Sequence, residues 1–311
     1  MCSANTLVGE FEMLRPRLTS VAYRLTSSVS DAEDAVQESW LRLAGLTEEQ
    51  RAGIRDLTGW LTTVVGRICL DRLQSAALRR ERYVGPWLPE PVITPVGAPG
   101  EDPLDIAVRD EGARMAALIV LDKLTPEQRV AFVLHDAFSV PYNEIAEILG
   151  VSVDAARQHA SRGRRALGDA QPPPRLSMAE QQEVLDRFMS AVLAGDVRAV
   201  AEVLHPDMVF IGDSDGKARN ARRIIVGAEK ILRFFSGLVR MYPPGALGTG
   251  RSVLVNGDLG FHLPSLQVDG YQKLDEHVGA FAIRDGRIEA IYDVANPDKL
   301  KPAFRGFASS A

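Results

Sequence analysis

The sequence predicts a multidomain chain in which two all-α segments precede an α+β domain. Apolar residues recur at helical spacing over 10–82 and 104–168, whereas short alternating β-rich runs appear after residue 176. Two proline-rich stretches, at 85–103 and 171–175, interrupt the chain where a helix hardly continues. A length of 311 residues suits two or three domains. We expect a first domain at 1–82, a linker at 83–103, a second domain at 104–170, a linker at 171–176 and a third domain at 177–311.

The first all-α segment contains one clearly amphipathic helix. Its apolar face follows the i, i+3, i+4 spacing and comprises Ala32, Ala35, Val36, Trp40 and Leu43. Ser30 and Glu33 have the spacing of a capping box, which predicts that the helix begins there.

The second all-α segment has the pattern of a helix-turn-helix. A helix start is predicted by three residues suited to its N-cap, N1 and N3 positions, which are Thr125, Pro126 and Gln128. Farther along, Pro141 opens a short helix that runs through Leu149. Gly150 then breaks the chain, and Ser152 can cap a second helix with Asp154 at its N2 position. Two short helices at this spacing predict a helix-turn-helix.

The second helix of this pair has two chemically distinct faces at 100° per residue. Small or apolar residues share one sector, which comprises Ala156, Ala160, Gly163 and Leu167. The remaining surface has four arginines and comprises Arg157, Gln158, Ser161, Arg162, Arg164 and Arg165. Such a face suits the major groove of DNA, with donors for guanine edges near the helix start and phosphate contacts farther along. A solvated helix end whose arginines complement the helix dipole is the alternative interpretation.

The C-terminal third predicts an α+β domain. Ser177 and Glu180 open a further amphipathic helix, and short alternating runs follow it at 208–212, 251–263 and 277–294. Hairpin turns are predicted at Asn256-Gly257-Asp258 and Asp285-Gly286. We expect a helix pair in front of a curved antiparallel sheet.

Composition excludes several classes of protein. No apolar run approaches the roughly 20 residues that span a bilayer, and no signal-peptide pattern precedes the first helix, so we expect a cytoplasmic protein without membrane contact. The cysteines are Cys2 and Cys69, which excludes a disulfide framework, and no pattern indicates a metal site or a cofactor. Up to residue 170 the chain has 19 basic and 24 acidic residues, so tight DNA binding is expected to need a larger partner.

Three stretches of the sequence resemble parts of extracytoplasmic-function (ECF) sigma factors of RNA polymerase. Residues 124–167 resemble region 4, which reads the −35 promoter element. The stretches DAEDAVQESWLRL (31–43) and WLTTVVGRICLDRL (60–73) resemble region 2.2 and regions 2.3 and 2.4, respectively. Region 2 at 1–90 and region 4 at 104–168 stand in the order that these factors have. The resemblance implies a factor that binds core RNA polymerase and directs initiation at −10 and −35 promoter elements.

The resemblance also implies roles for residues of region 2. The clamp coiled coil of the largest polymerase subunit would bind an acidic helix face that comprises Asp31, Glu33, Asp34 and Glu38. An acidic, merely solvated face is the alternative. The segment 46–58 and the helix after it would hold the melted −10 strand, with Arg67 and Arg72 as DNA contacts and Trp60 in the core. The chain has Gly66-Arg67 where many members have Arg-Asn.

A narrower resemblance, to the ECF41 group with a fused SnoaL-like domain of the NTF2-like fold, covers almost the whole chain. It is carried by YVGPWLPEP (83–91), DSDGKA (213–218) and NPDKL (296–300), although the usual Asp-Gly-Gly-Gly-Lys is here Asp-Ser-Asp-Gly-Lys, which predicts a stiffer loop. The resemblance implies control in cis by the C-terminal domain, with no separate anti-sigma factor. The implied regulatory residues are Trp87, Leu88, Pro89, Asp213, Asp215, Gly216, Lys217, Asn296, Pro297 and Asp298.

Two other functions stay open at this point. Folds of the NTF2-like class form cups that host enzymes and binding modules, so the chain could be a bifunctional regulator whose cup binds or turns over a small molecule. Candidate acid or base residues of the cup are His205, Asp213, Asp215, His262, His277, Tyr292 and Asp293. No residue is assigned as catalytic, and we expect a regulator rather than an enzyme. A dimeric repressor that acts without polymerase is the third interpretation.

Overall fold

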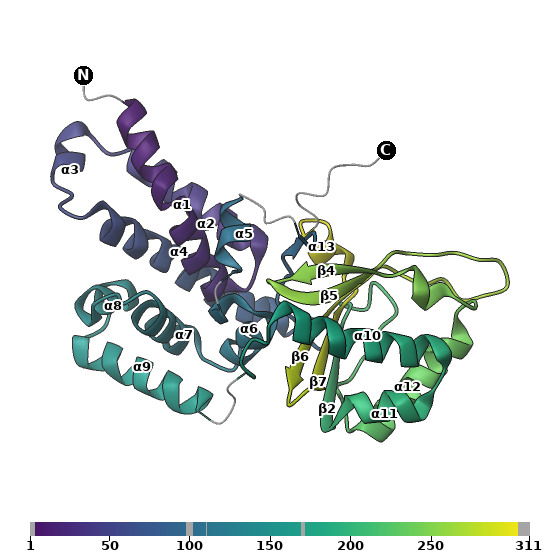
Figure 1. Cartoon of the computed structure of the whole chain (residues 1–311). Coiled ribbons are helices and arrows are strands. Elements are labelled where there is room, and N and C mark those ends of the chain that lie inside the picture. Colours follow the sequence, from purple (N-terminus) through teal and green to yellow (C-terminus); the bar gives the residue numbers. More distant parts are fainter. Residues whose placement is uncertain (1–3, 98–101, 110, 169–171, 304–311) are drawn as a thin grey trace. The chain divides into compact units, whose positions relative to one another are not determined.

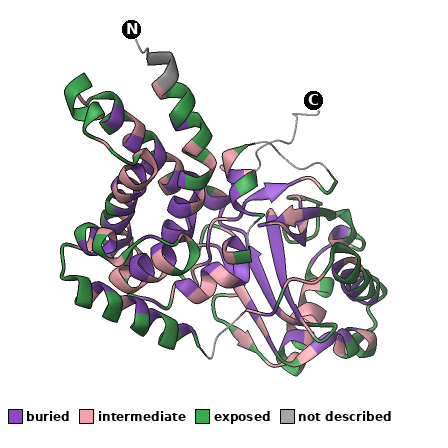
Figure 2. Cartoon of the chain, turned by 60° about the vertical axis from the view of Figure 1, so that its left-hand side comes forward, coloured by how far each residue is buried: buried purple, intermediate pink, exposed green. Residues whose placement is uncertain are grey.

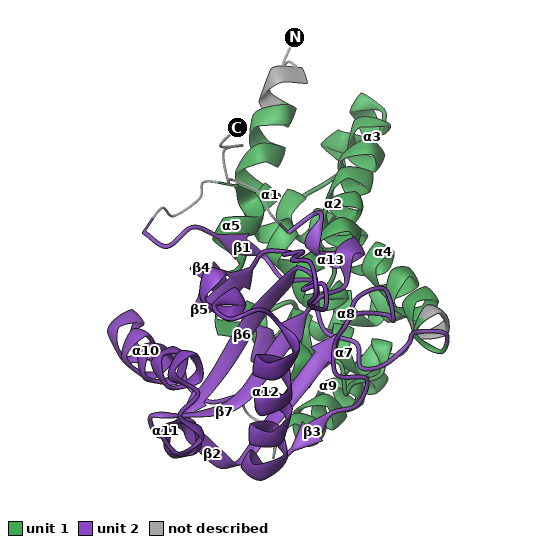
Figure 3. Ribbon diagram, turned by 90° about the vertical axis from the view of Figure 1, so that its right-hand side faces the viewer, with its two compact units in different colours: residues 1–81, 100–113, 117–171 green, residues 82–99, 114–116, 172–311 purple. Residues whose placement is uncertain are grey.

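A computed structural model describes residues 4–97, 102–109, 111–168 and 172–303 (Figure 1). The chain divides into two compact units (Figure 3). The helical unit comprises residues 1–81, 100–113 and 117–171, and the sheet unit comprises residues 82–99, 114–116 and 172–311. Most of the predicted first linker therefore belongs to the sheet unit.

The helical unit begins with a bundle of four helices. They are α1 (Ala4–Thr26), α2 (Val29–Ala44), α3 (Glu48–Ala52) and α4 (Leu57–Arg80). The apolar face predicted for α2 is buried apart from Trp40, whose ring lies 5.0 Å from that of Phe11. The predicted helix start at Ser30 is wrong, because Ser28 is the N-cap and its Oγ accepts a hydrogen bond from the backbone N–H of Asp31. Extended backbone at Ser28 lets the helix begin at Val29.

The helices that follow include the expected helix-turn-helix. They are α5 (Pro103–Ala107), η1 (Glu111–Ala113), α6 (Met115–Leu121), α7 (Pro126–Phe132), the π-helix η2 (Val133–Ala137), α8 (Tyr142–Leu149) and α9 (Val153–Leu167). Thr125 and Gln128 form the capping box of α7, and Ser152 caps α9. Gly150 ends α8 with a φ of 66°, a left-handed conformation that glycine adopts readily. The local sequence signals thus fixed both helices as predicted.

Close packing of α9 against α7 depends on its small face. The predicted small or apolar residues Ala156, Ala160, Gly163 and Leu167 are all buried. A Cβ at Gly163 would lie 3.2 Å from the Cβ of Phe132 and 3.3 Å from the carbonyl oxygen of Gln128. The polar residues of α9 therefore face away from α7.

The sheet unit is an α+β domain built on one seven-stranded sheet with the order β1-β4-β5-β6-β7-β2-β3. Its strands are β1 (Ile93–Thr94), β2 (Leu204–Asp213), β3 (Ile225–Val226), β4 (Arg251–Val255), β5 (Asp258–Leu263), β6 (His277–Arg284) and β7 (Arg287–Val294). Its helices are α10 (Met178–Ala194), α11 (Val197–Val203), α12 (Ala228–Met241), η3 (Ala246–Thr249) and α13 (Pro297–Leu300). Strands β6 and β7 are almost wholly buried (Figure 2).

Two details of the sheet correct the sequence-based expectation. The predicted hairpins are present, with positive φ angles at Asn256, Gly257, Asp285 and Gly286. However, β2 pairs with β7 in parallel, so the sheet is mixed rather than antiparallel. Linker residues Ile93 and Thr94 also add β1 to the edge of β4. The helix pair is a set of three, because α12 joins α10 and α11 in packing Phe188, Val200 and Ile231 into the core.

Among the described residues, no helix has the length and apolar character needed to cross a bilayer.

Candidate functional site

The predicted DNA-reading face of α9 is exposed along its whole length. All six residues of that face are exposed, namely Arg157, Gln158, Ser161, Arg162, Arg164 and Arg165. Two of the arginines also have partners within the helical unit. Arg157 lies 3.2 Å from Asp154 and over the ring of Tyr142, whereas Arg164 bonds Asp136 at 2.8 Å and the hydroxyl of Tyr142 at 2.9 Å. These bonds raise the pKa of Arg164 and hold its guanidinium against the end of η2.

In region 2, a residue predicted to contact DNA lies among the acidic residues predicted to bind polymerase. This residue is Arg72. Its Nη1 atom is 2.8 Å from Asp31 and 3.4 Å from Asp34, and its Nη2 atom is 4.0 Å from Glu38. Burial opposes the charge of Arg72, but the bonds to Asp31 and Asp34 raise its pKa. Glu33 is half-buried, and Glu38 also pairs with Arg42.

The helix predicted to hold the −10 strand packs against the helix-turn-helix. Arg67 of α4 donates to the carbonyl oxygen of Glu147 in α8 at 3.1 Å. One residue earlier, a Cβ at Gly66 would lie 3.0 Å from the Cδ1 atom of Ile148. Helices α4 and α8 thus pack together at Gly66, and a larger residue there would require the Ile148 side chain to shift. Trp60 is half-buried on α4.

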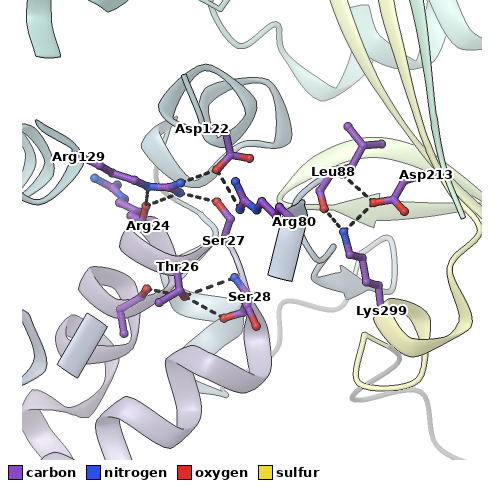
Figure 4. A network of polar contacts seen from close by, with 11 residues as sticks. Arg24, Thr26, Ser27, Ser28, Arg80, Leu88, Asp122, Arg129, Asp213 and Lys299 are labelled. Carbon is purple, nitrogen blue, oxygen red and sulfur yellow. Dashed lines mark hydrogen bonds and ion pairs between the residues drawn. The ribbon is translucent and has the colours of Figure 1, made fainter. Parts of the chain in front are cut away.

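A buried arginine joins the two sigma-like regions inside the helical unit (Figure 4). Arg129 of α7 is 2% exposed, and its guanidinium donates to the carbonyl oxygen of Arg24 at 2.9 and 3.1 Å and to the hydroxyl of Ser27 at 2.5 Å. It also pairs with Asp122, which Arg80 approaches to 3.5 Å. Burial lowers the pKa of Arg129, although Asp122 opposes that shift. No sequence pattern indicated this residue.

The predicted regulatory residues gather around the linker within the sheet unit. Asp213 at the end of β2 is wholly buried and binds the linker through both carboxylate oxygens. The hydroxyl of Tyr83 donates to its Oδ1 atom, and the backbone N–H of Leu88 donates to its Oδ2 atom at 2.7 Å. Burial and the nearby carboxylate of Asp213 raise the pKa of Tyr83, which keeps its hydroxyl protonated as the donor.

Lys299 of α13 completes this site from the other side (Figure 4). Its ammonium group is 2.6 Å from Asp213 Oδ2, donates to the carbonyl oxygen of Leu88 and lies 4.1 Å from the centre of the Trp87 ring. Lys299 is 6% exposed and Leu88 is 1% exposed, so the ion pair is shielded from water. We call Tyr83, Leu88, Asp213 and Lys299 the linker lock.

The residues around the linker lock support the same segment. Asn296 donates to the Tyr83 hydroxyl at 2.8 Å, and Pro297 follows it as the first residue of α13. Asp215 accepts from the backbone N–H of Val84, and Lys217 bridges Asp215 and Asp298 at 2.7 Å each. Pro89 is buried beside Leu88.

The altered loop keeps a left-handed backbone despite its two missing glycines. Asp215 has a φ of 49° and Gly216 a φ of 67°. A Cβ at Gly216 would lie 3.3 Å from the Cγ1 atom of Val84, so the loop also needs a small residue next to the linker. The carboxylate of Asp215 gains bonds to Val84 and Lys217 that offset the strain of its backbone.

A second buried carboxylate binds two arginines that lie on either side of residues 117–171 in sequence. Asp258 of β5 accepts from Arg114 at 2.7 Å and from Arg175 at 2.9 Å. Arg114 also donates to the carbonyl oxygen of Pro173 at 2.6 Å. These arginines stand just before and just after residues 117–171, so one carboxylate binds the chain on both sides of that segment.

The candidate acid and base residues of the C-terminal domain do not form one group. His277 and Asp293 are neighbours, with 2.8 Å between Nδ1 and Oδ2. His262 bonds Glu276 and Arg251, His205 accepts from the N–H of Asp207, and Tyr292 is buried. Asp213 and Asp215 hold the linker, as described above.

Sequence reasoning missed Tyr83 and Lys299, although both stand in the motifs at 83–91 and 296–300. Their roles depend on contacts between segments more than 80 residues apart. Nothing in the local sequence indicated Asp258, Arg114 or Arg175.

Comparison with known proteins identifies the family. The model of Sigma-70 region 2 matches residues 11–79 and that of Sigma-70, region 4 matches residues 115–167. The chain is 50% identical over 302 residues to the ECF RNA polymerase sigma factor SigJ of Mycobacterium tuberculosis (strain ATCC 25618 / H37Rv), which covers 94% of this chain and 93% of that protein. This chain belongs to the ECF RNA polymerase sigma factors.

A further relative and a solved structure agree with this assignment. The probable ECF RNA polymerase sigma factor SigI of M. tuberculosis (strain CDC 1551 / Oshkosh) is 33% identical over 222 residues, which cover 70% of this chain and 71% of that protein. The crystal structure of M. tuberculosis SigJ matches 94% of this chain and 98% of its own chain, with a TM-score of 0.80 and 49% identity. The predicted fold class is confirmed as two all-α sigma domains followed by an α+β domain. The function predicted from the sequence, that of an RNA polymerase sigma factor, is confirmed as well.

Proposed function

We propose that this sigma factor reads the −35 element with α9, holds the melted −10 strand with α4 and residues 46–58, and binds the polymerase clamp coiled coil through α2. The exposed arginine-rich face of α9 supports the first role, with Arg157 nearest the helix start. Asp34 is the most exposed of the acidic residues that surround Arg72 and is the best placed for a basic partner. The cytoplasm is the proposed location.

We further propose that the C-terminal domain controls initiation in cis through the linker lock, without a separate anti-sigma factor. The observation that carries this proposal is the buried pair of Asp213 and Lys299, which binds both the N–H and the carbonyl oxygen of Leu88. A backbone segment whose N–H and carbonyl groups are both bound by buried charges can adopt few other conformations. Because this segment connects region 2 to region 4, holding it restricts how the two regions can separate.

The packing inside the helical unit indicates which state the lock favours. Arg129 and the α4–α8 contact at Gly66 hold regions 2 and 4 together. The proposed −10 helix is therefore partly covered by the helix-turn-helix. A short, fixed linker favours this closed state, and release of the linker favours an open state that can bind polymerase and both promoter elements.

In vitro transcription with purified core polymerase tests the proposed promoter-reading roles. On a library of promoters, we expect transcripts that require this protein and a selective loss for Arg157→Ala. The matched control is Arg198→Ala in the sheet unit, whose side chain is 92% exposed. Asp34→Lys should reduce transcription at every promoter by weakening polymerase binding. The proposed roles fail if no promoter responds to the protein, or if Arg157→Ala and Arg198→Ala behave alike.

A further inference from the structure

A cavity of about 470 Å³ lies within the sheet unit, between α10, α12 and the sheet. Its walls are mainly apolar, and six of the chain's 11 phenylalanines line it: Phe188, Phe210, Phe234, Phe235, Phe261 and Phe281. Small-molecule sites usually have this size, an apolar lining and a few polar groups. A packed core does not leave such a space, since voids larger than a water molecule are few in protein interiors.

One corner of this cavity is polar. His277 and Asp293 both line it, and they are 9% and 5% exposed, respectively. His277 Nδ1 lies 2.8 Å from Asp293 Oδ2, and Asn220 donates to the backbone carbonyl oxygen of Asp293 at 3.0 Å. These contacts fix the orientation of the Asp293 carboxylate.

The second carboxylate oxygen of Asp293 is left without a partner. Among the described residues, no donor reaches the buried Oδ1 atom. A buried carboxylate oxygen without a donor is costly, and a matching donor recovers that cost. Other polar side chains also line the cavity, among them Arg219 and Arg251. Of the described residues that line it, Asp293 has the one buried side-chain atom, Oδ1, that no donor satisfies.

The charge of this corner limits which chemical group of a ligand can lie at Oδ1. Burial opposes the charge of His277, but the Asp293 carboxylate outweighs burial, with Asp275 and Glu276 adding to the effect, and the pKa of His277 is raised. The His277–Asp293 pair therefore has little net charge when it is formed. A ligand carboxylate placed at Oδ1 would meet a like charge, whereas a hydroxyl or N–H group would donate a hydrogen bond.

We propose that this cavity binds a neutral, mainly aromatic small molecule that donates a hydroxyl or N–H hydrogen bond to Asp293 Oδ1. The ring system would contact the phenylalanines, and the donor would fix its orientation. The proposed ligand site shares no residue with the linker lock. The proposal goes beyond promoter initiation, and its test needs no polymerase.

Calorimetric titration of the full chain with two matched probes tests this site. The first probe, 2-naphthol, has a hydroxyl donor, and the second, 2-methoxynaphthalene, has the same ring system and no donor. We expect 2-naphthol to bind about 10- to 100-fold more tightly, as a hydrogen bond to a charged acceptor predicts. Met189→Trp, which fills the cavity from α10, should abolish binding of both probes.

Substitution of the acceptor gives a second, independent readout. In Asp293→Asn, the oxygen stays on His277 and the amide NH₂ takes the place of Oδ1, so the preference for 2-naphthol should disappear or reverse. Asp269→Asn, an exposed acid of the same unit, is the control and should change nothing. Equal affinity of the wild-type chain for the two probes, tighter binding of 2-naphthoate, or no binding of any probe would overturn the proposal. The comparison of the two probes on the wild-type chain tests the proposal even if Asp293→Asn lowers the melting temperature.

Discussion

Removal of the ammonium group of the linker lock should free the linker while the rest of the fold remains. Lys299→Met keeps most of the volume of the side chain and leaves the buried Asp213 carboxylate without its counter-ion. Breaking a buried, hydrogen-bonded ion pair at one partner costs about 3–5 kcal/mol. The carbonyl oxygen of Leu88 loses a donor in the same change.

Hydrogen exchange of the peptide that covers residues 83–94 measures this effect directly. The backbone N–H groups of Val84, Leu88 and Val92 donate to Asp215, Asp213 and Asn256, so each reports on the bound linker. If the segment exchanges by local opening, 3–5 kcal/mol corresponds to exchange that is about 10²- to 10⁴-fold faster in Lys299→Met.

Lys217→Met is the matched control, because it removes a lysine that also pairs with two carboxylates near the linker. The Lys217 side chain is 45% exposed and that of Asp298 is 59% exposed, so water screens these pairs and each contributes at most about 1 kcal/mol. Loss of both pairs then costs at most about 2 kcal/mol, so exchange should change by no more than about 30-fold. The reasoning is refuted if Lys299→Met exchanges at the wild-type rate in a folded chain, or if Lys217→Met has an equal effect.

Three further predictions concern other sites. Arg157→Ala should cost about 1–3 kcal/mol of polymerase-dependent promoter binding at one −35 position, whereas Arg165→Ala should weaken binding to all promoters alike. Gel-shift titration over single-base promoter variants measures both effects. A uniform loss of binding for Arg157→Ala contradicts the assignment. The pKa of His277 is raised above 6.5 in the folded chain, so the stability that protonated His277 contributes is complete below that pH and is lost as the pH rises through the raised pKa. Urea unfolding between about pH 6 and about pH 9 should show this loss of stability in the wild-type chain and not in His277→Gln. Equal pH slopes for the two chains would argue against this contribution of His277. Asp258→Asn leaves the buried Arg114 without a counter-charge and should lower the free energy of unfolding, measured in urea, by about 3 kcal/mol. A change below about 1 kcal/mol would show that the Arg114–Asp258 pair is not important for stability.

Local signals explain which parts of the fold could be predicted from the sequence. Capping residues such as Thr125 and Ser152, and the left-handed Gly150, act within one turn of helix, so the helix-turn-helix was predictable to the residue. The start of α2 was not, because Ser28 and Ser30 both suit an N-cap and the backbone conformation decides between them. The parallel pairing of β2 with β7 joins segments about 80 residues apart, which no local pattern encodes.

In the candidate site, too, local motifs predicted some features, whereas others depend on contacts between segments that are distant in sequence. The motifs indicated the segments that meet at the linker, but not that Lys299 supplies the buried charge for Asp213. Arg72 was predicted as a DNA contact because of its position, whereas Asp31 and Asp34 lie 41 and 38 residues away in sequence and meet it only in the fold. Buried ion pairs of this kind depend on tertiary packing.

Control of initiation by the linker lock is tested most directly by in vitro transcription at a sigma concentration below saturation. Wild-type chain, Lys299→Met and Lys217→Met are compared with the same core polymerase and promoter. We predict that Lys299→Met yields more transcript than wild type, because a freed linker favours the open state, and that Lys217→Met matches wild type. Equal or lower transcript from a folded Lys299→Met chain would contradict the proposal that the lock restrains this sigma factor.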